Sequence, residues 1–189
     1  GDVQWMTAPS GILHEEMHAK AFASRGGPFE VVQLWVNLPQ RFKMTAPRYQ
    51  TLLDREIPLV ELPNDAGSAR LISGSLGGRQ GPAQTFTPVN LWDLKLRAGK
   101  SAVFTLGEGD TAVAFVLDGR VGSDGDARTA GAAELMVFER QGNDVTLRAE
   151  SDARVLLMTG EPIDEPVVGY GPFVMNTRQE IEQAISDIR

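Results

Sequence analysis

The hydrophobic and polar positions of the chain alternate in short segments, which glycine, proline, asparagine and aspartate separate. A period of two predicts β-strands, and a spacing of roughly 8–12 residues between segments is typical of an all-β sandwich or barrel. The pattern predicts strands at residues 31–36, 70–75, 89–96, 102–106, 111–117, 135–139, 145–149 and 155–159.

Two polar turns separate consecutive predicted strands. Asp118-Gly119 lies between residues 114–117 and Arg120-Val121. Because both turn residues tolerate a positive φ, this pair predicts a type I′ hairpin. Residues 141–144, with the sequence QGND, predict a second hairpin turn.

The period changes near the C-terminus. Thr177 and Glu180 have the spacing of a capping box, and apolar residues then recur at i, i+3, i+4 and i+7 from Ile181. This pattern predicts one amphipathic helix with an apolar stripe that packs against a neighbouring element. Before the helix, Pro166 and the glycine–proline cluster at 169–172 predict an extended strap.

Composition limits the class of protein. The 189 residues are 42% hydrophobic and 23% charged, which is typical of a globular chain with one or two domains. Lysine and arginine number 18 against 25 acidic residues, and the net charge of −7 argues against binding to nucleic-acid phosphates. The chain has no cysteine, which excludes disulfides and thiolate chemistry and fits a reducing compartment. We therefore expect a cytoplasmic protein.

No segment predicts contact with a membrane. Residues 1–11 lack the basic and then apolar pattern of a signal peptide. The longest apolar runs are far shorter than the roughly 20 residues that span a bilayer.

Both histidines of the chain lie in one stretch, His14-Glu15-Glu16-Met17-His18, so any imidazole chemistry occurs there. The stretch matches the zinc-protease pattern H-E-x-x-H, which requires a helix that presents both imidazoles on one face, with Glu15 activating a bound water. Pro9-Ser10-Gly11 before the stretch and the glycines after it disfavour a helix over residues 12–22.

A strand gives a different candidate centre. His14 and Glu16 would then point to the same side, roughly 6.5–7 Å apart at Cα, and could bind one ion. His18 would lie roughly 13 Å from His14, too far to join them. An imidazole and a carboxylate suit Fe(II), manganese or zinc. The plain alternative is that both histidines are solvated or hydrogen-bonded and bind nothing.

Several motifs together resemble the pirin family. The N-terminal matches are residues 1–8 (GDVQWMTA), 11–17 (GILHEEM), 33–38 (QLWVNL) and 43–50 (KMTAPRYQ). The C-terminal matches are residues 160–166 (GEPIDEP) and 171–177 (GPFVMNT), followed by Glu180-Ile181 and Gln183-Ala184.

The resemblance implies an all-β bicupin, with two antiparallel cupin barrels or sandwiches and a C-terminal strap and helix. It implies a partial N-terminal cupin at residues 1–50, a C-terminal cupin at 51–165, and the strap and amphipathic helix at 166–189. Pirins bind one mononuclear non-haem metal, most often Fe(II), in the N-terminal cupin. On this mapping His14 and Glu16 are metal ligands, whereas Glu15 and His18 are not.

The family's other two ligands form a His-x-His pair before the Gly-Asp-x-Gln-Trp-Met motif, and this sequence begins at that motif. We therefore expect an incomplete N-terminal cupin, weak or absent metal binding, and exposed strand edges that allow self-association.

The resemblance leaves two functions open. Some pirin-like proteins are quercetin 2,3-dioxygenases, in which the metal-bound carboxylate, here Glu16, takes a proton from the flavonol. Others are metal-dependent regulators that bind a transcription factor or an enzyme. The partner would accordingly be a small aromatic flavonol or a protein.

Overall fold

The computed structural model describes residues 1–188, and its chain divides into two compact units. The sandwich unit comprises Gly1–Trp5 and Tyr49–Pro162. The arm unit comprises Met6–Arg48 and Ile163–Arg189. The predicted division at residues 50 and 165 into a partial cupin, a second cupin and a strap with a helix stays a prediction.

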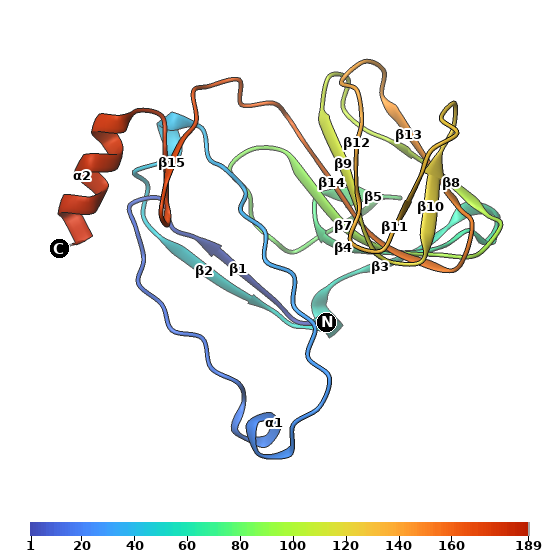
Figure 1. Ribbon diagram of the computed structural model, residues 1–189, viewed down its shortest axis with the longest axis horizontal. Helices are drawn as coiled ribbons and strands as arrows, with labels where there is room; N and C mark the ends of the chain where they lie inside the picture. The colour runs from blue at the N-terminus through green and yellow to red at the C-terminus, as the bar shows by residue number, and fades with distance from the viewer. Residues whose placement is uncertain (189) are drawn as a thin grey trace. The chain divides into compact units, whose positions relative to one another are not determined.

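The sandwich unit contains two antiparallel sheets (Figure 1). The larger sheet has six strands, in the order β12 (Leu135–Val137), β9 (Thr111–Asp118), β14 (Ala153–Gly160), β7 (Val89–Leu96), β4 (Gly67–Ser73) and β3 (Leu59–Leu62). The smaller sheet has four strands, in the order β11 (Thr129–Gly131), β10 (Arg120–Ser123), β13 (Asp144–Ala149) and β8 (Ser101–Thr105). Seven of the eight predicted strands therefore coincide with observed strands.

Three two-stranded sheets and several short helices complete the described elements. The paired strands are β1 (Val3–Thr7) with β2 (Arg48–Leu52), β5 (Ser75–Leu76) with β6 (Arg79–Gln80), and β15 (Val168–Tyr170) with β16 (Phe173–Met175). The helices are α1 (Lys20–Arg25), α2 (Arg178–Ile188) and the 3₁₀ turns η1 (Gln40–Phe42), η2 (Asp54–Glu56) and η3 (Pro63–Asp65). Among the described residues, no helix is both long and apolar enough to cross a lipid bilayer.

Side chains from both sheets fill the interior of the sandwich. Leu71, Trp92 and Leu157 come from the larger sheet, and Phe104 and Leu147 from the smaller one; all five are essentially inaccessible to solvent. The Trp92 and Phe104 rings are 5.8 Å apart. The alternation predicted from the sequence arises because every second residue of these strands is buried here.

Both predicted hairpins are wrong, since the turns join different sheets. Strand β9 pairs with β12 and β14, whereas β10 pairs with β11 and β13. Of the two turn residues Asp118 and Gly119, only Gly119 has a positive φ, 81°. The turn at 141–144 likewise leads from β12 to β13, which are in separate sheets. In a sandwich, a tight polar turn can serve a crossing between layers as well as a hairpin.

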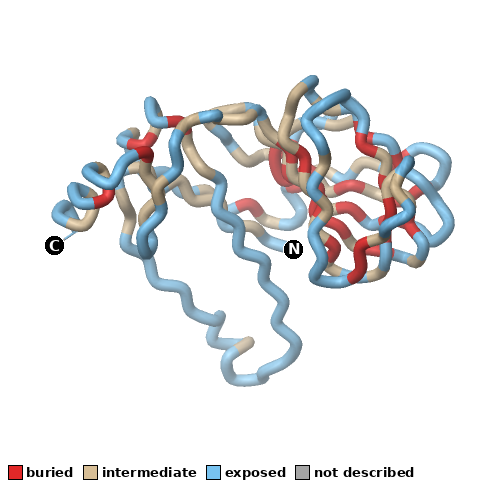
Figure 2. The backbone as a smooth tube through the Cα atoms, turned by 45° about the horizontal axis from the view of Figure 1, so that its top comes forward, coloured by how far each residue is buried: buried red, intermediate tan, exposed pale blue. Residues whose placement is uncertain are grey.

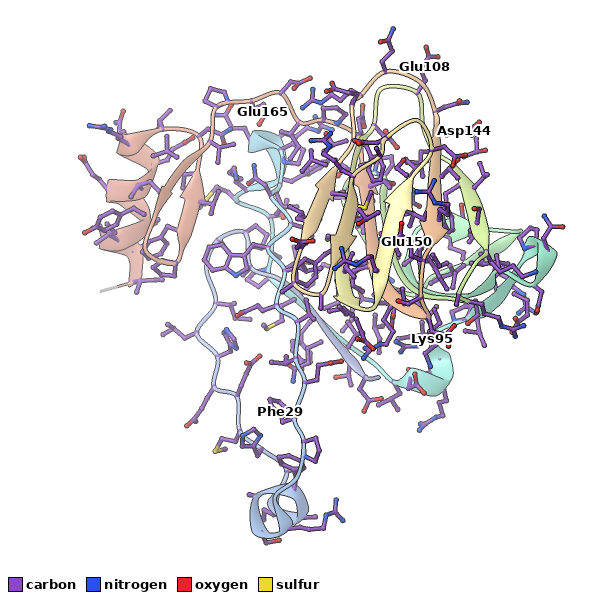
Figure 3. The ribbon with its side chains drawn as sticks, turned by 45° about the vertical axis from the view of Figure 1, so that its right-hand side comes forward. Phe29, Lys95, Glu108, Asp144, Glu150 and Glu165 are labelled. Atoms are coloured by element: carbon purple, nitrogen blue, oxygen red, sulfur yellow. The ribbon has the colours of Figure 1, made fainter. Side chains whose placement is uncertain are left out.

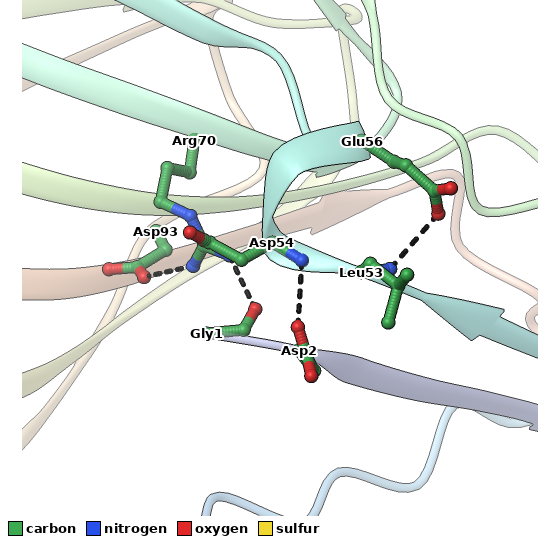
Figure 4. Close-up of polar contacts among 7 residues, drawn as sticks. All are labelled: Gly1, Asp2, Leu53, Asp54, Glu56, Arg70 and Asp93. Carbon is green, nitrogen blue, oxygen red and sulfur yellow. Dashed lines mark hydrogen bonds and ion pairs between the residues drawn. The ribbon is translucent and has the colours of Figure 1, made fainter.

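Charged and polar contacts join the first residues of the chain to the rest of the sandwich unit (Figure 4). Arg70 forms ion pairs with Asp54 at 2.7 Å and with Asp93 at 2.9 Å, and it donates to the Gly1 carbonyl oxygen. The backbone N–H of Asp54 donates to Asp2 Oδ1 at 2.8 Å. A side chain at Gly1 would lie within 2.5 Å of the Asp54 carboxylate, so glycine there leaves room for the ion pair.

A second apolar cluster continues this attachment. Val3 and Trp5 of β1 pack against buried Leu52, Ile72 and Leu91. The Trp5 indole N–H also donates to the Gln84 carbonyl oxygen at 3.1 Å. The Gly-Asp-x-Gln-Trp motif thus has a structural role in this unit.

The arm unit differs from the prediction at three places. Residues 31–36 form no strand and have no regular structure, and neither do residues 11–19, which carry His14 and Glu16. The strap, predicted to be extended, contains the β15–β16 hairpin. A strand needs a hydrogen-bonded neighbour as well as a suitable composition, and none of the described residues supplies one here.

The prediction of the C-terminal helix is confirmed. Thr177 Oγ1 accepts from the Glu180 N–H at 3.2 Å, and Glu180 Oε2 accepts from the Thr177 N–H at 2.8 Å, which together form the capping box. Ile181 is buried, Ala184 and Ile185 are partly buried, and Ile188 is exposed.

The filled interior leads to a stability prediction. We expect Leu157→Ala to reduce the free energy of unfolding by about 2–5 kcal/mol, because it removes fully buried methyl groups and leaves a cavity between the sheets. Leu135→Ala, at an exposed position of β12, should change it by less than about 0.5 kcal/mol. Urea denaturation of both variants measures the difference, and equal losses would contradict this description of the core.

Candidate metal centre

The candidate ligands lie on an irregular and exposed part of the arm unit. Helix α1 lies between two segments without regular structure, and Figure 2 shows both segments as largely exposed. The His14 side chain is 42% exposed and that of Glu16 is 56% exposed. Solvent, an ion or a small molecule can therefore reach both groups.

His14 and Glu16 approach each other without a strand to align them. His14 Nδ1 is 3.8 Å from Glu16 Oε1. Metal–nitrogen and metal–oxygen bonds in proteins are about 2.0–2.2 Å long, so two donor atoms up to about 4.2 Å apart can bind one ion. The two groups meet this condition, and an imidazole with a carboxylate suits a divalent ion of the iron, manganese or zinc type.

The donor set is small. Within residues 1–188 there is no group of three or more histidine, cysteine, aspartate or glutamate side chains that could bind a metal together. His14 and Glu16 therefore supply two ligands, and the other positions on an ion would be left to water or to groups outside the described residues. Two ligands fit a metal only as part of a larger site.

His18 has a different environment. Its ring lies 4.8 Å from the Phe29 ring and 5.4 Å from the Phe22 ring, and the two phenylalanine rings are 5.7 Å apart. Figure 3 labels Phe29 on the segment that follows α1. Helix α1 begins at Lys20, so residues 14–18 do not form the helical turn that a zinc protease needs. His18 is thus part of an aromatic cluster.

The arm unit also contains a cluster of polar side chains that the sequence did not predict. Lys43 is only 4% exposed, and its Nζ donates to Asn37 Oδ1 at 2.6 Å and to the Val174 carbonyl oxygen at 3.2 Å. Burial lowers the pKa of Lys43, while the negative charges of Glu165 and Glu180 raise it in part. A buried ammonium group is costly unless charges and hydrogen bonds compensate for it.

Both carboxylates receive further hydrogen bonds. Glu165 Oε2 accepts from the Gln40 backbone N–H at 2.6 Å and from Asn176 Nδ2 at 3.1 Å. Glu180 accepts from the Gln40 side-chain amide at 3.2 Å and from the Asn176 N–H at 2.9 Å. We call this set the Lys43 cluster, and its members are Asn37, Gln40, Lys43, Glu165, Asn176 and Glu180.

A sequence signal for the cluster existed. Most of its members lie in the segments that resemble pirins, at residues 33–38, 43–50, 160–166 and 171–177, and at Glu180. What the sequence lacked was any indication that residue 40, close to Lys43 in sequence, meets residues 165 and 180.

Comparison with known proteins gives one consistent family. The model of the pirin C-terminal cupin domain matches residues 91–189, and the pirin model matches residues 1–36. The chain is 51% identical over 187 residues to the putative quercetin 2,3-dioxygenase PA2418 of Pseudomonas aeruginosa. It is 38% identical over 189 residues to a pirin-like protein of Solanum lycopersicum.

These alignments cover 99% of this chain but 65% and 62% of the two relatives, so the chain spans less than two thirds of their length. Another relative, the putative pirin-like protein At3g59260 of Arabidopsis thaliana, is 38% identical, and the chain covers 68% of it.

Solved structures agree. Quercetin 2,3-dioxygenase from Acinetobacter baumannii matches with a TM-score of 0.95 and 45% identity, over 100% of this chain and 65% of that one. GK1651 from Geobacillus kaustophilus matches with a TM-score of 0.77 and 33% identity, over 88% of this chain and 66% of that one. With its β-rich cupin fold, its pirin motifs and these relatives, the chain belongs to the pirin family.

Proposed function

We propose that this chain contributes His14 and Glu16 to a mononuclear non-haem metal site of a pirin-type oxygenase that acts on flavonols such as quercetin. The observation that carries the proposal is the 3.8 Å approach of His14 Nδ1 to Glu16 Oε1 on an accessible segment. Support for the substrate class comes from relatives at 51% and 45% identity that carry the name quercetin 2,3-dioxygenase.

The two ligands would have different tasks. When bound, an Fe(II) ion supplies Lewis acidity toward the flavonol and redox chemistry toward O₂. His14 would bind the metal through a neutral imidazole nitrogen. The Glu16 carboxylate has two oxygens and is more than half exposed, so one oxygen could bind the metal while the other accepts the flavonol hydroxyl proton.

A second function rests on a separate observation. Residues 28–36 expose large apolar side chains, among them Phe29 (63%), Val31 (71%) and Trp35 (64%). Clusters of exposed aromatic and aliphatic groups are typical of protein interaction sites. The alternative is therefore a regulator that binds a transcription factor or an enzyme, and this binding depends on the metal. The net charge of −7 favours a protein partner over direct contact with DNA.

Flavonol turnover tests the enzyme proposal. We expect slow loss of quercetin absorbance that depends on added Fe(II), and we expect Glu16→Ala to lower this rate by about 10²-fold or more, as loss of a general base does. Glu15→Ala is the matched control, because it removes the same charge one residue away and should leave the rate unchanged.

Equal rates for Glu16→Ala and the unchanged chain would contradict the enzyme proposal. Partner capture that depends on metal and is lost in Trp35→Ala would then favour the regulator.

Metal binding can be measured apart from turnover. We expect weak binding of paramagnetic Co²⁺, seen as selective broadening of NMR signals from residues 12–17, because within residues 1–188 only two ligands converge there. His14→Ala should abolish the broadening. His18→Ala should retain it, since His18 lies among the Phe22 and Phe29 rings.

Broadening that survives His14→Ala would show that the ion binds elsewhere. One tightly bound ion per chain would contradict a site with two ligands.

A further inference from the structure

We propose that the Lys43 cluster is an acid-sensitive clasp: protonation of Glu180 releases the C-terminal strap and α2 from residues 37–43. This inference is independent of the proposed enzymatic function, because it involves none of the candidate metal ligands. Figure 3 labels Glu165 on the strap.

Apolar contacts alone hold the C-terminal segment weakly. Ile181 is the buried residue of α2, and Ala184 and Ile185 are only partly buried. The buried residues of the two apolar core clusters all belong to the sandwich unit. Because the buried apolar surface of α2 is confined to one side chain, the polar contacts of the cluster contribute substantially to keeping the segment docked.

Those polar contacts converge on three ionisable groups. Lys43 donates to the Val174 carbonyl oxygen of β16, and Gln40 donates to both Glu165 and Glu180. The charged groups that face Lys43 are Glu165 from the strap and Glu180 from α2. The hydrogen-bond partners of Lys43 are neutral, and the negative charges of Glu165 and Glu180 compensate in part for the buried ammonium charge.

Acid weakens this arrangement. The hydrogen bond from the Gln40 side chain, with others from Thr177 and from the Asn176 and Thr177 backbone, lowers the pKa of Glu180 below its ordinary value of 4.5. The folded arm unit therefore binds this proton less readily than the unfolded chain does. The stabilising effect of the ionised Glu180 carboxylate is complete above pH 4.5 and is lost as the pH falls through its lowered pKa.

Alkali has the opposite effect. Burial lowers the pKa of Lys43 below 10.5, so the folded protein gives up this proton more easily than the unfolded chain. By the same linkage, raising the pH toward 10.5 relieves the cost of the buried charge and does not open the clasp. The clasp should therefore open in acid and stay closed in alkali.

Hydrogen exchange, corrected for the intrinsic effect of pH, tests the clasp. Between pH 6 and pH 3.5 we expect the amides of residues 181–185 to lose protection by about tenfold or more, comparable to losing a hydrogen bond to a charged group. The amides of β7 and β14 should keep their protection over this range. The double variant Glu165→Gln, Glu180→Gln should have the low protection already at pH 6 and lose no more in acid.

Two further variants keep the test decisive. Glu182→Gln removes an exposed carboxylate of the same helix outside the cluster, and it should behave like the unchanged chain. Lys43→Met should lower the protection of residues 181–185 at pH 6 and leave that of β7 and β14 unchanged. The proposal fails if α2 and the sandwich strands lose protection in parallel, or if the double variant retains the acid response.

Discussion

The arm unit depends on the compensation of one buried charge. The ammonium group of Lys43 lies where water scarcely reaches it, and Glu165 and Glu180 are the charges that offset it. Removing a single partner of a buried charged group leaves the other uncompensated, which is why such groups tolerate few alternative arrangements. Gln40 donates hydrogen bonds to both carboxylates, which lie 125 and 140 residues after it in the sequence. Residues 37–43 and α2 are therefore connected through the same set of hydrogen bonds.

The sandwich unit is organised by a different constraint, the exclusion of water from two facing sheets. Its interior is occupied by aromatic and aliphatic side chains such as Trp92 and Phe104, and both histidines lie in the arm unit. The proposed chemistry is accordingly assigned to the arm unit, where His14 and Glu16 are accessible. One unit thus has a packed apolar interior, while the other carries the exposed polar and apolar groups from which function is proposed.

Much of the sandwich could be predicted because its signals are local. Strand β7 was predicted with its observed bounds, since the alternation of buried and exposed positions can be recognised from neighbouring residues. The hairpin at Asp118-Gly119 was wrong because a turn sequence specifies a change of direction and leaves the pairing partner open. The strand predicted at residues 31–36 was wrong because a β-prone segment still needs a neighbour for its backbone groups.

By itself, the sequence determined the strand pattern of the sandwich, the capping box at Thr177 and Glu180, and the restriction of imidazole chemistry to residues 14–18. It also indicated His14 and Glu16 as a pair, because two residues at i and i+2 are close in almost any extended chain. Only the tertiary structure decided that consecutive strands enter different sheets and that Gln40 meets Glu165 and Glu180. These arrangements join residues far apart along the chain, and the energy that selects them, from burial and charge compensation, exists only once the chain has folded.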